Sequence, residues 1–231
     1  MRGGSDDDWH VNGNIGADLV YGGDGHDTLF GGQGNDQVFG EAGNDSVSGD
    51  FDNDTLRGGT GNDWLFGSHG DDQILGEDGD DTMDGWGGVD SLTGGNGNDR
   101  LFGDFANDTL SGDHGADTLF GGLGDDLLFG VSAVQDSGEI DVFAFGVGSG
   151  VDVVIGFNPF VDWIALSANV NGTGIDTPAD ALAAVFVPGG VQTPTILDLG
   201  SGNTVIFLDM PINAFGLESF RIFDPALVSF A

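Results

Sequence analysis

The chain has 231 residues and a formal net charge of −35, with 39 Asp and Glu against four Lys and Arg. A surface this acidic argues against nucleic acid and anionic membranes as partners, because both attract basic proteins. The absence of Cys excludes disulfide bonds and thiol chemistry, and no apolar run is long enough to predict a membrane span. Residues 1–4 lead into acidic residues rather than an apolar segment, so we expect no secretory signal peptide at this end.

Residues 4–12 (GSDDDWHVN) form an imperfect copy of the repeat that begins at Gly13. In this register Gly4 is at position one, Trp9 replaces an Asp at position six, and Val11 is the apolar residue at position eight. We interpret residues 1–12 as a cap that covers the open end of the repeats. The alternative is that they are a remnant of a longer parent protein. His10 lies beside acidic residues and is interpreted as solvated rather than as a ligand.

Residues 13–129 consist of thirteen uninterrupted copies of a nonapeptide, for example GGDGHDTLF from Gly22. The template is G-x-x-G-x-D-x-U-x, where U is apolar. Position one is always Gly, position six is always Asp, and position eight is always Val, Leu, Ile or Met. Position four is Gly in eleven copies, and Asp52 and Ala106 are the departures. A fixed short period of this kind predicts a stacked repeat architecture.

Hydrophobic burial alone does not stabilise such a repeat. One inward apolar residue per nine contributes about 1.5–3 kcal/mol, whereas ordering each of nine backbones costs about 1–2 kcal/mol. The block also carries 23 Asp and two Glu against Arg57 and Arg100, which gives −25 + 2 = −23 and strong self-repulsion. Cations must therefore offset this charge. Carboxylate and carbonyl oxygens without Cys, and with little His, favour calcium over zinc or copper.

The spacing predicts the local geometry. We expect G-x-x-G-x-D to form a turn in which the glycines adopt positive φ and expose carbonyls, and x-U-x to form a short strand with U inward. Two nonapeptides then make one coil of about 18 residues, and successive coils stack about 4.8 Å apart. Each turn lies beside the turn two repeats later, so cations can sit between them.

This block resembles the RTX calcium-binding repeat family. The resemblance implies an all-β fold, a right-handed parallel β-roll (β-solenoid) of tandem nonapeptides. It also implies that each calcium takes a carboxylate from both flanking turns, with backbone carbonyls at positions two and four of the first turn and one and three of the next. The implied metal ligands are Asp18, Asp27, Asp36, Asp45, Asp54, Asp63, Asp72, Asp81, Asp90, Asp99, Asp108, Asp117 and Asp126. The implied carbonyl donors include those of Gly23, Gly25, Gly32, Gly34, Gly40 and Ala42.

The same pairing sets an upper bound on the number of ions. Thirteen turns paired with the turn two repeats later give at most eleven sites, and eleven divalent ions would add +22 to the −23 of the block. We therefore expect several calcium ions, up to about eleven. Sites that use the turns of Asp52 and Ala106 are the weakest expectations, because Asp tolerates left-handed backbone better than Ala does.

Other side chains of the block suggest weaker hypotheses. His26, His69 and His114 occupy turn positions without the spacing of a transition-metal site. Position nine is often aromatic, at Tyr21, Phe30, Phe39, Phe66, Phe102, Phe120 and Phe129. These rings either stack along the outer face of the strands, which we favour, or form a docking strip for a partner or a carbohydrate. Phe51 and Phe105 occur in the similar copies GDFDNDTLR and GDFANDTLS, a pairing that the sequence explains only as a duplication.

Residues 131–231 lose the glycine register and become more hydrophobic. We expect a connector at 131–137 and a small C-terminal β-rich cap with a core of its own, which closes the other end of the roll. Its predicted strands are at 140–145, 151–157, 161–166 and 218–223, and TPTILDL and NTVIFLDM are expected to form a hairpin around 200–202. A short helix is predicted from Thr177 to about Ala184.

The C-terminal segment resembles the region after the repeats in serralysin-like and other RTX proteins, through D-x-F-x-F, V-D-x-x-x-x-F and V-D-x-I-x-L. This resemblance implies an uncleaved export signal near the C terminus, at residues 131–231, that a type I secretion machine reads. The apolar ending at 227–231 matches the family's terminal motif loosely.

No catalytic motif is found, neither H-E-x-x-H, nor G-x-S-x-G, nor a phosphate loop. We therefore predict a secreted calcium-binding module, without enzyme activity, that is disordered without calcium and folds when calcium binds outside the cell. A second hypothesis is an accessory part of a larger secreted enzyme such as a protease, lipase or alginate epimerase, covalently linked to its catalytic domain. A third is an adhesive or polysaccharide-binding module that uses the position-nine aromatic residues.

Overall fold

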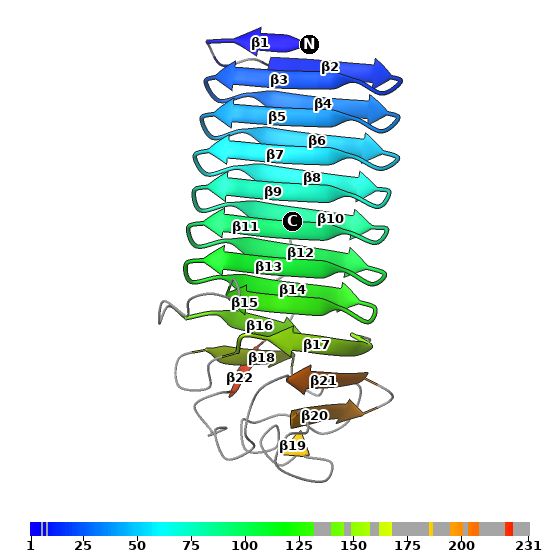
Figure 1. Ribbon diagram of the computed structural model, residues 1–231, viewed down its shortest axis with the longest axis vertical. Helices are drawn as coiled ribbons and strands as arrows, with labels where there is room; N and C mark the ends of the chain where they lie inside the picture. The colour runs from blue at the N-terminus through cyan, green and yellow to red at the C-terminus, as the bar shows by residue number, and fades with distance from the viewer. Residues whose placement is uncertain are drawn as a thin grey trace.

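The chain winds into a stack of flat coils, and each coil contains two strands on opposite sides (Figure 1). The computed structural model describes residues 1–5, 7, 9–131, 140–145, 149–157, 162–167, 185–186, 195–200, 203–207 and 220–223. In this described part the regular elements are all strands. The predicted all-β parallel solenoid is confirmed.

The strands form two sheets that face one another. The 12-stranded sheet contains, in spatial order, β1 (Arg2–Gly4), β3 (Leu19–Asp24), β5 (Gln37–Ala42), β7 (Thr55–Thr60), β9 (Gln73–Asp78), β11 (Ser91–Asn96), β13 (Thr109–His114), β15 (Leu127–Val131), β17 (Val151–Ile155), β21 (Asn203–Phe207), β20 (Thr195–Gly200) and β19 (Val185–Phe186). The 10-stranded sheet contains β2 (Trp9–Ile15), β4 (Thr28–Gln33), β6 (Ser46–Phe51), β8 (Trp64–His69), β10 (Thr82–Gly87), β12 (Arg100–Phe105), β14 (Thr118–Leu123), β16 (Val142–Phe145), β18 (Trp163–Ser167) and β22 (Phe220–Phe223). Neighbouring strands pair in parallel, except that β20 is antiparallel to both β19 and β21.

Strand pairing follows the predicted coil of 18 residues. Leu29 pairs with Val47, and Val47 pairs with Leu65, each 18 residues further along the chain. The predicted element lengths were wrong, however. Each strand within the repeats has six residues, from position seven to position three of the next copy, and the turn has only three. Positions two and three belong to the ladder because they pair with the same positions of the next coil, as Gly32 does with Asp50.

The core is a single column of side chains between the sheets. All thirteen position-eight residues are at most 1% exposed, which confirms the one inward apolar residue per repeat. The column continues past the repeats through Phe143, Val154 and Ile164. Near its end the rings of Phe143 and Phe207 both pack against Phe157, with centroids 5.7 and 5.2 Å apart. Large aromatic side chains thus replace the small aliphatic ones where the nonapeptides stop.

The N-terminal copy is offset from its predicted register. Trp9 pairs with Thr28, a position-seven residue, whereas Val11 pairs with Leu29 as expected, so His10 is the additional residue of a β-bulge. The prediction that Trp9 takes the Asp position was therefore wrong by one residue. Gly4 is likewise opposite Gly23, at position two rather than one. A bulge accounts for both differences, because it shifts every residue before it by one.

The strands after residue 131 extend the two sheets of the repeats. The strands predicted at 140–145, 151–157, 161–166 and 218–223 are confirmed as β16, β17, β18 and β22, and the predicted hairpin is β20–β21. The expected connector after Val131, the helix at 177–184 and the ending at 227–231 lie outside the described residues. In the described part of the chain, no helix is long and apolar enough to cross a membrane.

Candidate metal centre

Two ladders of aspartates run along the edges of the roll, one at each row of turns. In each ladder the backbone amide of one Asp donates a hydrogen bond to Oδ1 of the Asp in the next coil, for example Asp27 to Asp45 at 2.8 Å. One ladder contains Asp18, Asp36, Asp54, Asp72, Asp90, Asp108, Asp126 and Asp152. The other contains Asp27, Asp45, Asp63, Asp81, Asp99, Asp117, Asp141 and Asp162. All thirteen predicted Asp ligands are thus brought into two continuous rows.

The carboxylates point into the roll because the position-one glycine leaves room for them. A Cβ on Gly58 would lie 2.3 Å from Oδ2 of Asp63 and 2.8 Å from the carbonyl oxygen of Gly76 in the next coil. Both distances are shorter than a real Cβ contact allows. The invariant Gly at position one therefore allows the Asp of its own copy to be buried.

The outer carboxylate oxygens are buried and have no hydrogen-bond partner. This applies to Oδ2 of Asp18, Asp36, Asp45, Asp54, Asp63, Asp72, Asp81, Asp90, Asp99, Asp108, Asp117 and Asp126. Leaving a buried polar group unsatisfied costs about 1–3 kcal/mol, and more for a charged one. A row of such oxygens is the arrangement expected where an oxygen-preferring cation completes the site.

Burial raises the pKa of these carboxyl groups far above their usual range. The pKa of Asp54, Asp108 and Asp117 is raised to about 8, first by burial and then by neighbouring aspartates of the same ladder. The same causes raise the pKa to about 7 at Asp63, Asp90 and Asp99. Burial also raises it to about 6 at Asp45, Asp72, Asp81 and Asp126. The hydrogen bond from the backbone amide opposes these shifts at each group but does not cancel them. Ionised aspartates in this position therefore need a nearby positive charge.

The backbone of the turns adopts left-handed geometry at two positions of every copy. Position four is left-handed even where glycine is missing, with φ of 73° at Asp52 and 85° at Ala106. Position two is left-handed throughout, although eight of the thirteen copies carry a side chain there, including Glu41 and Trp86. Sequence reasoning had assigned positive φ to the glycines. The structure assigns it to positions two and four, and position one needs glycine for space alone.

Backbone carbonyls line the same turns. In the pair formed by Asp27 and Asp45, the carbonyl oxygen of Ala42 accepts a hydrogen bond from the amide of Gly25 at 2.8 Å. The carbonyl oxygen of Gly40 lies 2.7 Å from where a Cβ of Gly22 would be. The donors available here are two carboxylates and several carbonyls. The described residues contain no group of three or more His, Cys, Asp or Glu side chains that could hold a metal. This donor set fits a hard cation that uses backbone oxygen, and not zinc.

Three ladder members after the repeats were not among the predicted ligands. Asp141, Asp152 and Asp162 accept hydrogen bonds from the amides of the preceding ladder aspartates at 3.0–3.1 Å. Each is at most 3% exposed. The signal that could have identified them is the triplet D-x-U (Asp-Val-Phe, Asp-Val-Val, Asp-Trp-Ile), which keeps positions six to eight after the glycines have disappeared.

The histidines of the block do not converge on a metal site. His26 Nδ1 accepts a hydrogen bond from the amide of Asn44 at 2.7 Å, within an outer ladder of position-five side chains. Asn62 and Asp80 continue this ladder in the following coils. His69 packs between the rings of Phe51 and Trp86.

The aromatic residues form two kinds of row. Position-nine rings are partly covered and stack with the coil above, as Tyr21 does on Phe39 with centroids 5.0 Å apart. This agrees with the stacking interpretation. A second row, which we name the exposed aromatic row, crosses β6, β8, β10 and β12 and consists of Phe51, His69, Trp86 and Phe105. Phe51, Trp86 and Phe105 are 45–51% exposed. The pairing of Phe51 and Phe105 that the sequence left unexplained is thus the two ends of one row.

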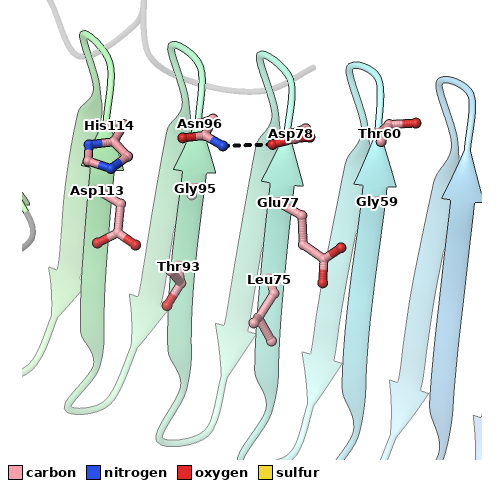
Figure 2. A pocket seen from close by; sticks show the side chains of 11 residues that line it. Gly59, Thr60, Leu75, Glu77, Asp78, Thr93, Gly95, Asn96, Asp113 and His114 are labelled. Atoms are coloured by element: carbon pink, nitrogen blue, oxygen red, sulfur yellow. Dashed lines mark hydrogen bonds between the residues drawn. The ribbon is translucent and has the colours of Figure 1, made fainter.

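A shallow acidic depression lies on the opposite sheet, across β7, β9, β11 and β13 (Figure 2). Its volume is about 380 Å³, and Glu77, Asp78 and Asp113 line it. Glu77 is paired with Arg57 at 2.7 Å, and Asp78 accepts a hydrogen bond from Asn96 at 2.7 Å. Because these acids have partners or face solvent, the depression differs from the buried ladders.

Comparison with known proteins bears on these ladders. A family model of the RTX calcium-binding nonapeptide repeat matches residues 2–38, 12–47, 21–56, 48–83, 57–92 and 93–128. Together these matches span 2–128, more than half of the chain. A search of curated proteins found no match.

Solved structures with a similar fold include two bacterial proteins. The extracellular lipase LipA from Serratia marcescens is 19% identical with a TM-score of 0.41, and the match covers 87% of this chain and 45% of the lipase. The AlgE6R3 subunit of the mannuronan C5-epimerase from Azotobacter vinelandii is 23% identical with a TM-score of 0.33, and the match covers 74% of this chain and 78% of that subunit. The chain therefore spans less than half the length of the lipase.

Proposed function

Because the chain belongs to the family of RTX calcium-binding nonapeptide-repeat proteins, we propose that it is the calcium-binding β-roll module of a secreted protein and that calcium binding drives its folding. The observation that carries this proposal is the pair of aspartate ladders with buried, unpartnered carboxylate oxygens. Such oxygens are suited to a hard divalent cation. The role we propose is structural rather than catalytic.

Each ion would be held by the Oδ2 atoms of two successive ladder aspartates and by backbone carbonyls of the same two turns. Calcium would supply the positive charge that offsets the carboxylates and links one coil to the next. The chain's own contribution is positioning, because the amide of one Asp orients the carboxylate of the next through Oδ1. Up to about eleven ions would be bound within the nonapeptides by this pairing.

Coupling between calcium and folding follows from the energetics of the repeat. One fully buried aliphatic side chain per nine residues stabilises the coil by about 1.5–3 kcal/mol, much less than the cost of ordering nine backbones. Binding free energy from a site that exists only in the folded state adds directly to folding. Extracellular calcium modules bind at about 10⁻⁴–10⁻³ M, so the chain would stay unfolded in the cytosol and fold outside the cell.

Export in the unfolded state is the route that we propose, through a type I secretion machine that reads the C-terminal segment 131–231. An expression strain with this machine tests it. Deletion of the chain from Phe220 onward should abolish its appearance in the medium. Continued export of this truncated chain would contradict the route without affecting the calcium proposal.

The experiment that tests the calcium proposal is a titration of the full chain followed by far-ultraviolet circular dichroism, with bound calcium counted by equilibrium dialysis. We expect a disordered spectrum in chelator and a cooperative gain of β signal as several ions bind. Magnesium at the same ionic strength is the control, because it keeps its waters and requires octahedral geometry. An unchanged β spectrum in excess chelator would refute calcium-driven folding.

A second candidate function, binding of a neutral polysaccharide, is favoured by the exposed aromatic row. Rings exposed side by side along one sheet provide flat apolar faces on which sugar rings can pack. Asp50 and Asp104 occupy position two on the flanking strands β6 and β12 and can accept hydrogen bonds from sugar hydroxyls. The same carboxylates repel anionic polymers, so the ligand class is a neutral glycan.

Binding to this row is tested by affinity electrophoresis in calcium with neutral and anionic polysaccharides. Trp86→Ala should abolish retardation by a neutral glycan. The matched control is Trp64→Ala, because Trp64 is also half exposed on the same sheet but lies outside the row. Equal retardation of both variants, or no retardation of the native chain, would contradict the assignment.

A further inference from the structure

The last turn before residue 152 repeats the ladder geometry without a nonapeptide. The amide of Asp126 donates a hydrogen bond to Oδ1 of Asp152 at 3.1 Å, and the amide of Val153 donates to the carbonyl of Asp126 at 2.8 Å. Gly150 has a φ of 80° and lies directly against Gly124, the position-four glycine of the last repeat. The turn is therefore stacked on the repeats as one more coil.

Three buried oxygen atoms lie at this turn. Asp126, Ser149 and Asp152 are 2%, 2% and 1% exposed, respectively. Asp126 Oδ2, Ser149 Oγ and Asp152 Oδ2 have no hydrogen-bond partner. The hydroxyl of Ser149 is an addition to the pattern, because the ladder within the nonapeptides consists of carboxylates and backbone only. A buried hydroxyl and two buried carboxylate oxygens without partners indicate a missing electropositive ligand.

The side chains are close enough to influence one another. Burial raises the pKa of Asp152 to about 8, with the Asp126 charge adding to the rise and the Ser149 hydroxyl opposing it. The carboxyl group of Asp126 in turn responds to the side chain of Asp152. The three groups therefore share one small volume between the last repeat and β17.

We propose that Asp126, Ser149 and Asp152 form an additional calcium site, which lies beyond the last nonapeptide and joins the C-terminal segment to the roll. Two carboxylates and a hydroxyl are oxygen donors of the type that calcium takes. This inference rests on the proposed calcium function, and it extends the ion count past the sites that the nonapeptide pattern predicts. Its structural consequence is that folding of β17 onto β15 depends on calcium.

The test is the number of calcium ions bound by the full chain at saturation, measured by equilibrium dialysis on the native chain and on Asp152→Asn. The amide oxygen of Asn can still accept the hydrogen bond from Asp126, so the ladder contact is kept while one carboxylate oxygen is removed. Asp125→Asn is the matched control, because it removes the same charge from the adjacent turn at an exposed position. Its side-chain oxygen can still accept the hydrogen bond from Val151.

We expect Asp152→Asn to bind one ion fewer than the native chain, and Asp125→Asn to bind the native number. A native count for Asp152→Asn would overturn the site while leaving the calcium function intact. If the native chain bound no calcium, the proposed function itself would fail. Ser149→Ala, a smaller change, should keep the fold and weaken the affinity of one ion by about tenfold, as loss of one oxygen donor predicts. Unaltered affinity of every ion in Ser149→Ala would also overturn the site.

Discussion

The amide of Asp63 donates a hydrogen bond to Oδ1 of Asp81 at 2.8 Å, and Oδ2 of Asp81 is buried without a partner. Each ladder aspartate is thus tied to its neighbour by one oxygen and keeps the other for a ligand. In the proposed arrangement every interior aspartate serves the coil before it and the coil after it. This double role makes substitutions in the ladder more damaging than their single charge suggests.

Asp81→Asn should therefore lower the calcium count by about two ions, since both adjoining sites lose a carboxylate oxygen. The amide can still accept the hydrogen bond from Asp63, which separates metal binding from the ladder contact. Asp80→Asn is the matched control, because Asp80 is the neighbouring residue, is exposed, and accepts its hydrogen bond from Asn98 through one oxygen. Equilibrium dialysis measures both counts. Equal counts for the two variants would exclude the carboxylates as paired ligands.

Glycine 58 tests the reason for the invariant first position. A Cβ at Gly58 would collide with Oδ2 of Asp63, so Gly58→Ala should displace that carboxylate and weaken calcium binding at its two sites. We expect the midpoint of the calcium titration to rise at least about tenfold, equivalent to about 1.4 kcal/mol. The control is Gly59→Asn at position two, where Asn14 already adopts a φ of 78°. Circular dichroism titration compares them. A larger effect of Gly59→Asn than of Gly58→Ala would contradict the steric explanation.

The repeat fixes much of this fold in advance, and the reason is physical. A register of 18 residues follows from two copies per coil, and burial of Leu65 between Val47 and Met83 follows from one apolar residue per copy. The positive φ at Glu41 could not be predicted in this way, because side chains at position two oppose that geometry. Stacking against the next coil imposes it.

The candidate site was predictable where the glycines persist and not beyond. Asp141 and Asp162 extend one ladder although neither is preceded by the G-x-x-G pattern. The sequence shows their apolar neighbours but not that β16 and β18 continue the same sheet. The bulge at His10 was also hidden, since an inserted residue leaves the composition of the copy unchanged. Both are consequences of long-range pairing rather than of local propensity.

The inward column makes a separate prediction about stability. Leu65→Ala removes a fully buried side chain that pairs with Val47 and Met83 in the adjoining coils, and should destabilise the calcium-loaded protein by about 2–5 kcal/mol. Leu75→Ala is the control, because Leu75 is at position nine and only partly buried. Urea unfolding in saturating calcium measures the free energy of both. A loss no greater for Leu65→Ala than for Leu75→Ala would show that the column is not the core.

The raised pKa values of the ladder predict opposite effects of pH with and without calcium. The pKa of Asp54, Asp108 and Asp117 is raised to about 8 by burial and by neighbouring aspartates, against an ordinary value of 3.8. Without calcium the folded state therefore binds more protons than the unfolded state. Its stability contribution is fully present below the unfolded pKa and is lost as the pH rises through the folded pKa.

We therefore expect the calcium-free chain to gain β structure on acidification from pH 8 to pH 5, as the buried carboxyl groups take up protons in place of calcium. In the calcium-loaded chain protons compete with the ion, so the calcium concentration at half-saturation should rise over the same interval, and binding near pH 7 should release protons. Circular dichroism of a calcium-depleted sample, calcium titrations at pH 5 and 8, and proton release in weakly buffered solution measure the three effects. Ladder aspartates that were solvated and ionised in the folded chain would give neither acid-induced β structure nor proton release, which would remove the burial that the proposed calcium sites depend on.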